Sequence, residues 1–170
     1  GVMMNIKTVE SSIETPDGRP LGFEYIQELN GMTKKVVGKI NPLGADTMKT
    51  TVMNNTQMSD FDYPEDALMS EGLRLRQKRL GLKEGTRGSA VIFSPELGST
   101  VKTSWTVGQG QVVDLLGKEK KLTRVESVIS LPTGSMTSVN FVDDDIFGHK
   151  VIIPMMGMKL ELIEAPKEFA

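Results

Sequence analysis

The sequence LGFEYIQELNGMTKKVVGKI, residues 21–40, decides the fold class. Its first nine residues alternate between apolar side chains on one side of an extended chain and the carboxylates Glu24 and Glu28 on the other. This period of two predicts a strand with one buried face. Asn30-Gly31 is the dipeptide best suited to a type I′ turn, so we predict a hairpin whose second strand covers 32–40.

Turn signals recur about every ten residues along the rest of the chain, and the stretches between them are short and rich in β-forming residues. Because short connections join antiparallel neighbours, these stretches favour an antiparallel sheet. Gly108-Gln109-Gly110 is interpreted as a turn or a bulge, since no helix follows it as in a phosphate loop. Beyond the hairpin, we predict strands at 5–14, 47–53, 56–61, 88–93, 101–107, 112–116, 122–130, 136–143, 147–154 and 158–164.

One segment, from Pro64 to about Arg79, lacks turn pairs and consists of good helix formers. Asp62 is placed to cap it, and Pro64 suits a first helical turn. Basic side chains gather toward its end, where the helix dipole favours cations, and Leu80-Gly81 supplies a stop. The sequence therefore predicts one main helix at about 64–79.

About ten strands with one helix make an α+β fold that is mostly β. No internal repeat, low-complexity tract or linker interrupts residues 1–170, so we predict a single domain. Gly1 to Met4 is interpreted as the remnant of a cleaved tag or as a disordered end, and a signal segment would then have been removed ahead of it.

Alternation with polar neighbours also identifies the side chains that face the core. Trp105, for example, falls between Ser104 and Thr106 and shares a side of its strand with Val101. We expect nine such side chains to be mostly buried, namely Leu21, Phe23, Tyr25, Val101, Trp105, Leu122, Phe141, Leu160 and Leu162.

Composition excludes several classes of function. There is no Cys, which excludes disulfides and thiolate chemistry, and the single histidine, His149, excludes His-rich zinc sites. A net charge of −2 and an aromatic content of 5% argue against nucleic-acid binding. No window reaches the roughly 18 apolar residues of a membrane span. We therefore predict no enzyme activity, no cofactor, no nucleic-acid partner and no membrane span.

Asp143-Asp144-Asp145, with His149, is a cluster of metal-ligand residue types. Hard cations need several oxygen ligands at fixed positions. Consecutive residues at a strand end point alternately, so at most two of these carboxylates can face one site. The sequence favours a solvated hairpin turn over an adventitious cation site, and we predict no metal centre.

The 11 methionines admit two interpretations, ordinary core filling or the lining of an apolar pocket. On the predicted helix, Met69, Leu73 and Arg76 share one largely apolar face. An arginine there either extends to the rim, lies where the helix frays, or faces the interior and holds a carboxylate or headgroup. The candidate ligand-binding residues are Arg76, Met69, Leu73, Trp105 and Met136.

Several turn and packing positions form a recurring bacterial pattern, namely GLKEGT and FSP within 71–95, Gly117, Arg124-Val125, FVDDD at 141–145, and 160–170. In this pattern the chain resembles the non-catalytic β-rich region that precedes the peptidase domain of some bacterial transglutaminase-like proteins. It is also similar to related families of unknown function of the lipoprotein-carrier (LolA/LolB-like) type.

The resemblance implies an extracytoplasmic, periplasmic protein with a LolA-like half-barrel, in which a strongly curved antiparallel sheet wraps around one helix. No catalytic residue transfers, because the Cys-His-Asp site of those proteins lies in a separate domain. The function expected is non-enzymatic binding of a lipid-like ligand or a hydrophobic polypeptide. The alternative is an accessory domain, without a small ligand, that positions a transglutaminase-like or other envelope enzyme. A large continuous apolar cavity would favour the first of these.

Overall fold

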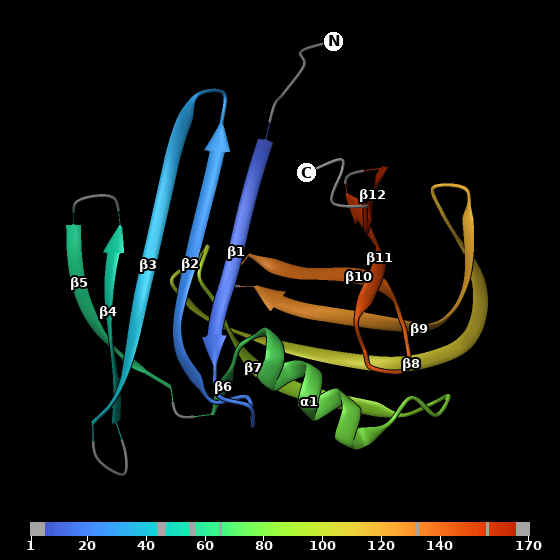
Figure 1. Ribbon diagram of the computed structural model, residues 1–170, viewed down its shortest axis with the longest axis horizontal. Helices are drawn as coiled ribbons and strands as arrows, with labels where there is room; N and C mark the ends of the chain where they lie inside the picture. Colours follow the sequence, from blue (N-terminus) through green and yellow to red (C-terminus); the bar gives the residue numbers. More distant parts are fainter. Residues whose placement is uncertain are drawn as a thin grey trace. The chain divides into compact units, whose positions relative to one another are not determined.

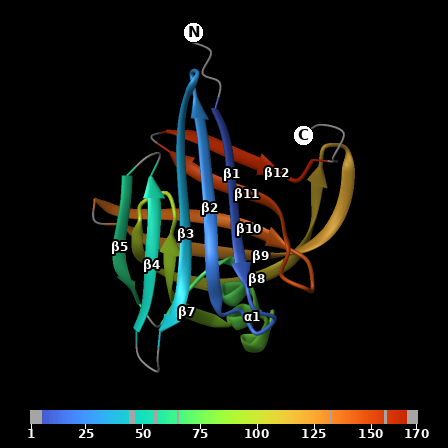
Figure 2. The same cartoon turned by 60° about the vertical axis from the view of Figure 1, so that its left-hand side comes forward.

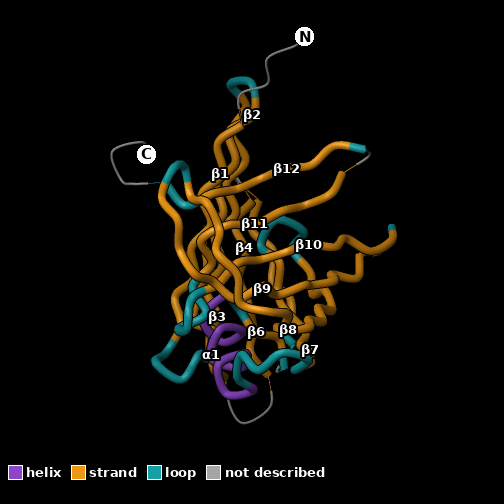
Figure 3. The backbone as a smooth tube through the Cα atoms, turned by 90° about the vertical axis from the view of Figure 1, so that its right-hand side faces the viewer, coloured by secondary structure: helices purple, strands orange, loops and turns teal. Residues whose placement is uncertain are grey.

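Strands dominate the structure, a computed structural model in which the described residues contain twelve strands and one helix (Figures 1 and 3). The mostly β, α+β class predicted from the sequence is therefore confirmed. The twelve strands include 67–68, which the sequence does not predict as a strand, and the predicted strands 101–107 and 112–116 form one. No helix in the described part of the chain is long and apolar enough to cross a membrane. The predicted tag remnant, 1–4, lies outside the described residues, which are 6–43, 47–54, 57–64, 66–131, 133–155 and 157–165.

The chain forms two compact units, whereas the sequence predicts one domain over 1–170. The first unit comprises 1–73 and 91–100, and the second comprises 74–90 and 101–170. The boundaries between the units fall inside the helix, after residue 73, and inside two strands, after residues 90 and 100.

The first unit is built on a five-stranded antiparallel sheet in which each strand pairs with the next along the chain (Figures 1 and 2). The predicted hairpin forms, with Leu29 opposite Met32. Asn30 and Gly31 have φ angles of 48° and 83°, as a type I′ turn requires. The strands are β1 (Ile6–Glu14), β2 (Pro20–Leu29), β3 (Met32–Leu43), β4 (Thr47–Asn54) and β5 (Gln57–Tyr63).

The core of the first unit centres on three aromatic rings. The ring of Phe93 lies 5.0 Å from that of Phe23 and 5.2 Å from that of Tyr63. Gly38 lies opposite Phe23, and a Cβ at Gly38 would be 2.1 Å from the Phe23 ring, so only glycine fits there. The buried members of this core are Phe23, Tyr25, Val36, Ile40, Tyr63, Ala67, Met69 and Phe93.

The second unit contains most of β8 and all of β9 to β12, paired antiparallel in chain order. Trp105 on β8 lies over Gly88 on β7, where a Cβ would come 2.2 Å from the indole ring. The full sheet order is β12-β11-β10-β9-β8-β7-β6. Its strands are β6 (Ala67–Leu68), β7 (Arg87–Ser94), β8 (Ser99–Leu115), β9 (Lys118–Leu131), β10 (Gly134–Val142), β11 (Gly148–Met155) and β12 (Met158–Ile163).

β8 is one long strand, although the sequence predicts two. Its register against β9 shifts between Val107 and Gly110, so the glycine pair forms a bulge and not a turn. The turn into β9 comes at Leu116-Gly117, whose φ angles are 56° and 86°. The sequence predicts a break between 116 and 122 but does not place the turn at Leu116, because leucine is rare at a left-handed position.

Burial follows the predicted alternation in seven of the nine selected side chains, with six buried and Leu21 half-buried. Leu160 and Leu162 are the exceptions, at 43% and 50% exposed. The prediction was wrong for them because β12 is an edge strand, and alternation alone does not say whether anything covers an apolar face. The six buried side chains are Phe23, Tyr25, Val101, Trp105, Leu122 and Phe141.

The helix α1 (Ser70–Leu80) begins at Ser70, so the predicted start at Pro64 was wrong. Residues 67–68 instead form β6, which pairs in parallel with β7. The carboxylate of Glu14, at the end of β1, accepts hydrogen bonds from the backbone N–H of Glu71 at 2.9 Å and of Gly72 at 2.7 Å. A cap from a distant strand therefore sets the start of the helix, which no local pattern encodes.

We expect Leu116→Asn to raise the free energy of unfolding by about 1 kcal/mol, because asparagine tolerates a positive φ and the 63%-exposed leucine side chain loses little burial. Urea denaturation followed by far-UV circular dichroism measures the change. Leu97→Asn is the matched control, since Leu97 is an exposed turn residue without a positive φ. An equal gain in both variants would show that φ is not the cause.

We expect Glu14→Gln to lower the free energy of unfolding by about 1–2 kcal/mol, because an uncharged amide offers one acceptor oxygen to two helix N–H groups. Hydrogen exchange at Glu71 and Gly72 should accelerate at the same time. Glu28→Gln, on the exposed side of β2, is the control and should change neither measurement. Unchanged exchange at both amides would contradict the capping role.

Candidate ligand-binding site

A small apolar pocket lies beside the edge strand β1 in the first unit. Its volume is about 90 Å³. Three segments that are far apart in the sequence meet around it: the middle of β1, the start of α1, and the end of β7 with the turn that follows. The lining residues are Glu10, Ser11, Ser12, Met69, Ser70, Leu73, Ile92, Phe93 and Pro95.

The pocket is apolar inside and polar at its rim. Met69, Phe93 and Pro95 are buried, and Phe93 belongs to the aromatic core of the unit. Ser11 and Ser70 are exposed at the rim. The cavity therefore offers a hydrophobic floor, fixed by core packing, with hydroxyl and backbone groups around its mouth.

Among the described strands, β1 pairs only with β2, so none forms a ladder with its other edge. An edge strand of this kind presents unpaired N–H and C=O groups along its length. Val9 and Ile13 of β1 are also exposed, at 44% and 65%. The pocket therefore opens beside backbone groups that can form an additional ladder of hydrogen bonds.

The rim beside β1 is acidic. Burial raises the pKa of Glu10, and repulsion from the carboxylate of Glu96 raises it further. Desolvation, followed by these same two carboxylates, also raises the pKa of Tyr25. Lys34 is the nearby cation, donating to the backbone oxygen of Glu96 at 3.0 Å and lying 5.8 Å from the Tyr25 ring centre. A further cation beside Glu10 and Glu96 would relieve their repulsion.

Two of the five candidate residues from the sequence, Met69 and Leu73, line this pocket. The other three belong to the second unit and do not line it: Arg76 is exposed, Trp105 is buried and Met136 is half-buried. An arginine facing an interior cavity is therefore not found at Arg76. Sequence reasoning missed Glu10, Ile92 and Phe93, because their proximity arises from pairing between distant segments.

A second, larger depression of about 460 Å³ lies at the β2–β3 turn. It is lined by Lys7, Glu28, Asn30, Gly31 and Thr33, all of them exposed. A depression with polar, solvent-exposed walls does not provide the apolar cavity expected for a lipid-like ligand.

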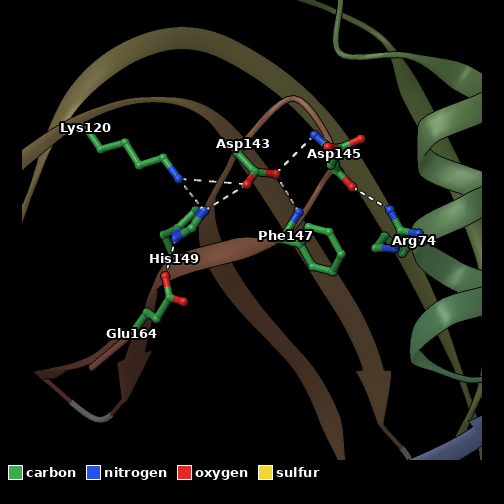
Figure 4. Close-up of polar contacts among 7 residues, drawn as sticks. All are labelled: Arg74, Lys120, Asp143, Asp145, Phe147, His149 and Glu164. Carbon is green, nitrogen blue, oxygen red and sulfur yellow. Dashed lines mark hydrogen bonds and ion pairs between the residues drawn. The ribbon is translucent and has the colours of Figure 1, made fainter. Parts of the chain in front are cut away.

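The Asp143–His149 cluster lies at the turn between β10 and β11, in the second unit (Figure 4). One oxygen of Asp143 accepts the backbone N–H groups of Asp145 at 3.1 Å and Phe147 at 2.9 Å. Its other oxygen lies 3.0 Å from Nε2 of His149, and Glu164 contacts Nδ1 of the same ring. Lys120 Nζ lies 2.8 Å from Nε2.

The ring nitrogen Nε2 of His149 cannot donate to Asp143 and accept from Lys120 at the same time. The charged imidazole donates to both Asp143 and Glu164, whereas the neutral ring with a proton on Nδ1 accepts from Lys120. Both ring nitrogens are thus engaged by side chains from three places, namely the β10–β11 turn, β9 and the residue after β12.

The three consecutive aspartates do not converge on one point. Asp144 is exposed, and the carboxylate of Asp145 accepts from Lys78 at 2.5 Å. Arg74 donates to the backbone oxygen of Asp145 at 2.7 Å (Figure 4). Among the residues that the structure describes, no group of three or more Asp, Glu, His or Cys is placed to hold a metal ion.

We expect Asp143→Asn to lower the free energy of unfolding at neutral pH by about 1–2 kcal/mol. Partial burial raises the pKa of Asp143, but hydrogen bonds from His149 and from the N–H groups of Phe147 and Asp145 outweigh it and hold the pKa below the ordinary 3.8. Because its pKa is lowered on folding, the charged Asp143 carboxylate stabilises the folded state above pH 3.8. This stabilisation is lost as the pH falls through the pKa of the folded state.

The difference in free energy of unfolding between wild type and Asp143→Asn should therefore shrink as the pH falls below 3.8. Urea denaturation repeated across that pH range measures it. Asp144→Asn, one residue along and exposed, is the matched control. A difference that stays constant down to the lowest pH would rule out a stabilising carboxylate at Asp143.

Comparison with known proteins finds no matching family model, no similar curated protein and no similar solved structure. The resemblance to transglutaminase-associated and LolA-like regions therefore stays a prediction.

Proposed function

We propose that the protein is a non-enzymatic binding domain whose ligand is a hydrophobic segment of a polypeptide, bound in extended conformation along β1. The observation that carries the proposal is the apolar pocket of about 90 Å³ beside the open edge of that strand. In β-strand addition, main-chain hydrogen bonds supply affinity and a pocket for one side chain supplies specificity.

The size of the pocket favours a polypeptide over a lipid. A cavity of about 150 Å³ accommodates a benzene molecule, so 90 Å³ suits one aliphatic side chain. A lipid tail, like other small ligands, needs several hundred Å³ to be enclosed. The anchor side chain would contact Met69, Leu73 and Phe93 on the pocket floor.

The acidic rim adds a second recognition element. Glu10 and Glu96 repel each other, and Glu10 lies on the pocket side of β1. A lysine or arginine two residues from the anchor, on the same side of the extended segment, would therefore be favoured there. The expected ligand therefore carries an apolar anchor and a basic residue two positions away from it.

The absence of Cys, and the engagement of both ring nitrogens of His149 by Lys120, Asp143 and Glu164, support a binding role without catalysis. An accessory domain that positions an envelope enzyme remains the alternative, in which the bound segment would belong to that enzyme. The periplasmic location and the half-barrel wrapped around the helix, both implied by the resemblance, are part of this proposal.

Fluorescence anisotropy with a synthetic Val/Thr-rich peptide, carrying one central Leu and a Lys two residues after it, tests the proposal. Replacing that Leu by Gly should weaken binding by about tenfold or more, because it removes the burial of one leucine side chain. Leu73→Phe in the protein should weaken binding similarly by filling the pocket. Leu75→Phe is the matched control, since Leu75 does not line the pocket.

A fluorescent fatty acid serves as the competing ligand in the same assay. Binding of the fatty acid that is insensitive to Leu73→Phe, together with failure of the peptide to bind, would overturn the proposal. Replacing the peptide lysine by glutamate should weaken binding several-fold if Glu10 and Glu96 contribute as argued.

A further inference from the structure

β12 forms one edge of the seven-stranded sheet (Figure 2). Its apolar side chains form an exposed row. Met158, Leu160 and Leu162 share one side of the strand and are 73%, 43% and 50% exposed. Among the described strands β12 has one neighbour, β11, so its other edge is open. This surface belongs to the second unit, whereas the pocket beside β1 belongs to the first.

The backbone of β12 shows which groups point outward. The N–H of Glu164 donates to the carbonyl of His149 at 2.9 Å, so it points inward, toward β11. Lys159 lies opposite Pro154, which has no N–H to donate to the Lys159 carbonyl. Inward and outward bonding alternate along an antiparallel strand. The N–H and C=O groups of Lys159, Glu161 and Ile163 therefore point toward the open edge.

The opposite side of β12 carries two charges of opposite sign. Lys159 Nζ lies 2.6 Å from one oxygen of Glu161, and Lys150 of β11 lies 3.0 Å from the other. Hydrogen bonds from Lys159, and then from Lys150, hold the pKa of Glu161 below its usual range, so this carboxylate stays charged at neutral pH.

We propose that β12 pairs antiparallel with β12 of a second copy of this chain, about a two-fold axis at Leu160. Leu160 then faces its own symmetry mate, and Met158 faces Leu162 of the other copy, on one side of the joined sheet. On the other side, Lys159 of each copy faces Glu161 of the other copy, so the pair occurs twice. The outward-pointing N–H and C=O groups of the two strands then bond to each other. Opposite charges directly across an antiparallel pair stabilise it.

The charges select this register over its neighbours. A two-fold axis perpendicular to the sheet pairs only residues on the same side of the strand. Each alternative register therefore corresponds to an axis that lies on a different residue of β12. Centring the axis on Glu161 places two glutamates opposite each other. Centring it on Lys159 places two lysines opposite each other. The sequence MKLELI is thus self-complementary in the register centred on Leu160.

Sedimentation equilibrium over a concentration series tests the proposal on the intact chain. The wild type should show a monomer–dimer equilibrium. Lys159→Glu and Glu161→Lys should each weaken dimerisation by about tenfold or more, because each creates two like-charge pairs across the axis. Lys118→Glu, an exposed charge reversal at the β8–β9 turn, is the control and should not weaken it.

An equimolar mixture of the two single variants, one of them ¹⁵N-labelled, supplies the decisive measurement. In the mixed dimer each introduced charge faces an opposite charge, so native mass spectrometry should show the heterodimer in excess over either homodimer. The double variant Lys159→Glu/Glu161→Lys restores self-complementarity in one chain and should dimerise like the wild type.

A wild type that stays monomeric at every concentration would overturn the proposal, and Lys159 and Glu161 would then protect an open edge. A dimer that responds to neither charge reversal would overturn it as well, by placing the interface elsewhere. If the single variants weaken dimerisation but their mixture forms no heterodimer, the register centred on Leu160 is wrong.

Discussion

The hydrogen bonds from the start of α1 to the carboxylate of Glu14 fix the geometry of the first unit. They tie the helix to the end of β1, and Ser12 supports the same carboxylate at 2.6 Å. Gly72 makes the close approach possible, since a Cβ there would lie 2.6 Å from the carbonyl oxygen of Gly18. Two helix N–H groups that would otherwise lack acceptors are thus satisfied by a strand.

The pocket beside β1 is a consequence of that junction. The cap holds the first turn of α1 against the strand, which places Leu73 and Met69 beside Ser11 and Phe93. Because core packing fixes Met69 and Phe93, the pocket is preformed. Preformed apolar pockets cost little ordering on binding, so an edge strand beside one suits the capture of an extended segment.

β12 shows a different solution to the problem of an open edge. β1 combines its open edge with a pocket, whereas β12 combines its open edge with an alternation of apolar and charged residues. Unpaired edges invite association, and charges on them decide which association is allowed. Lys159 and Glu161 permit one register of pairing between two copies of β12. If the chain is monomeric, they prevent pairing in every register.

Local chemistry in the sequence was sufficient for the hairpin at Asn30-Gly31, because the φ angles of a type I′ turn depend on two residues only. It was also sufficient for the buried side of β2 and β8, since alternation is a property of a single strand. It could not place the start of α1, where the cap comes from Glu14, nor the turn at Leu116, where strand pairing outweighs an unfavourable φ. Tertiary structure alone decided that Met69 and Leu73 share a pocket with Phe93 while Leu160 stays exposed, because proximity between distant segments and the cover over an apolar face are not local properties.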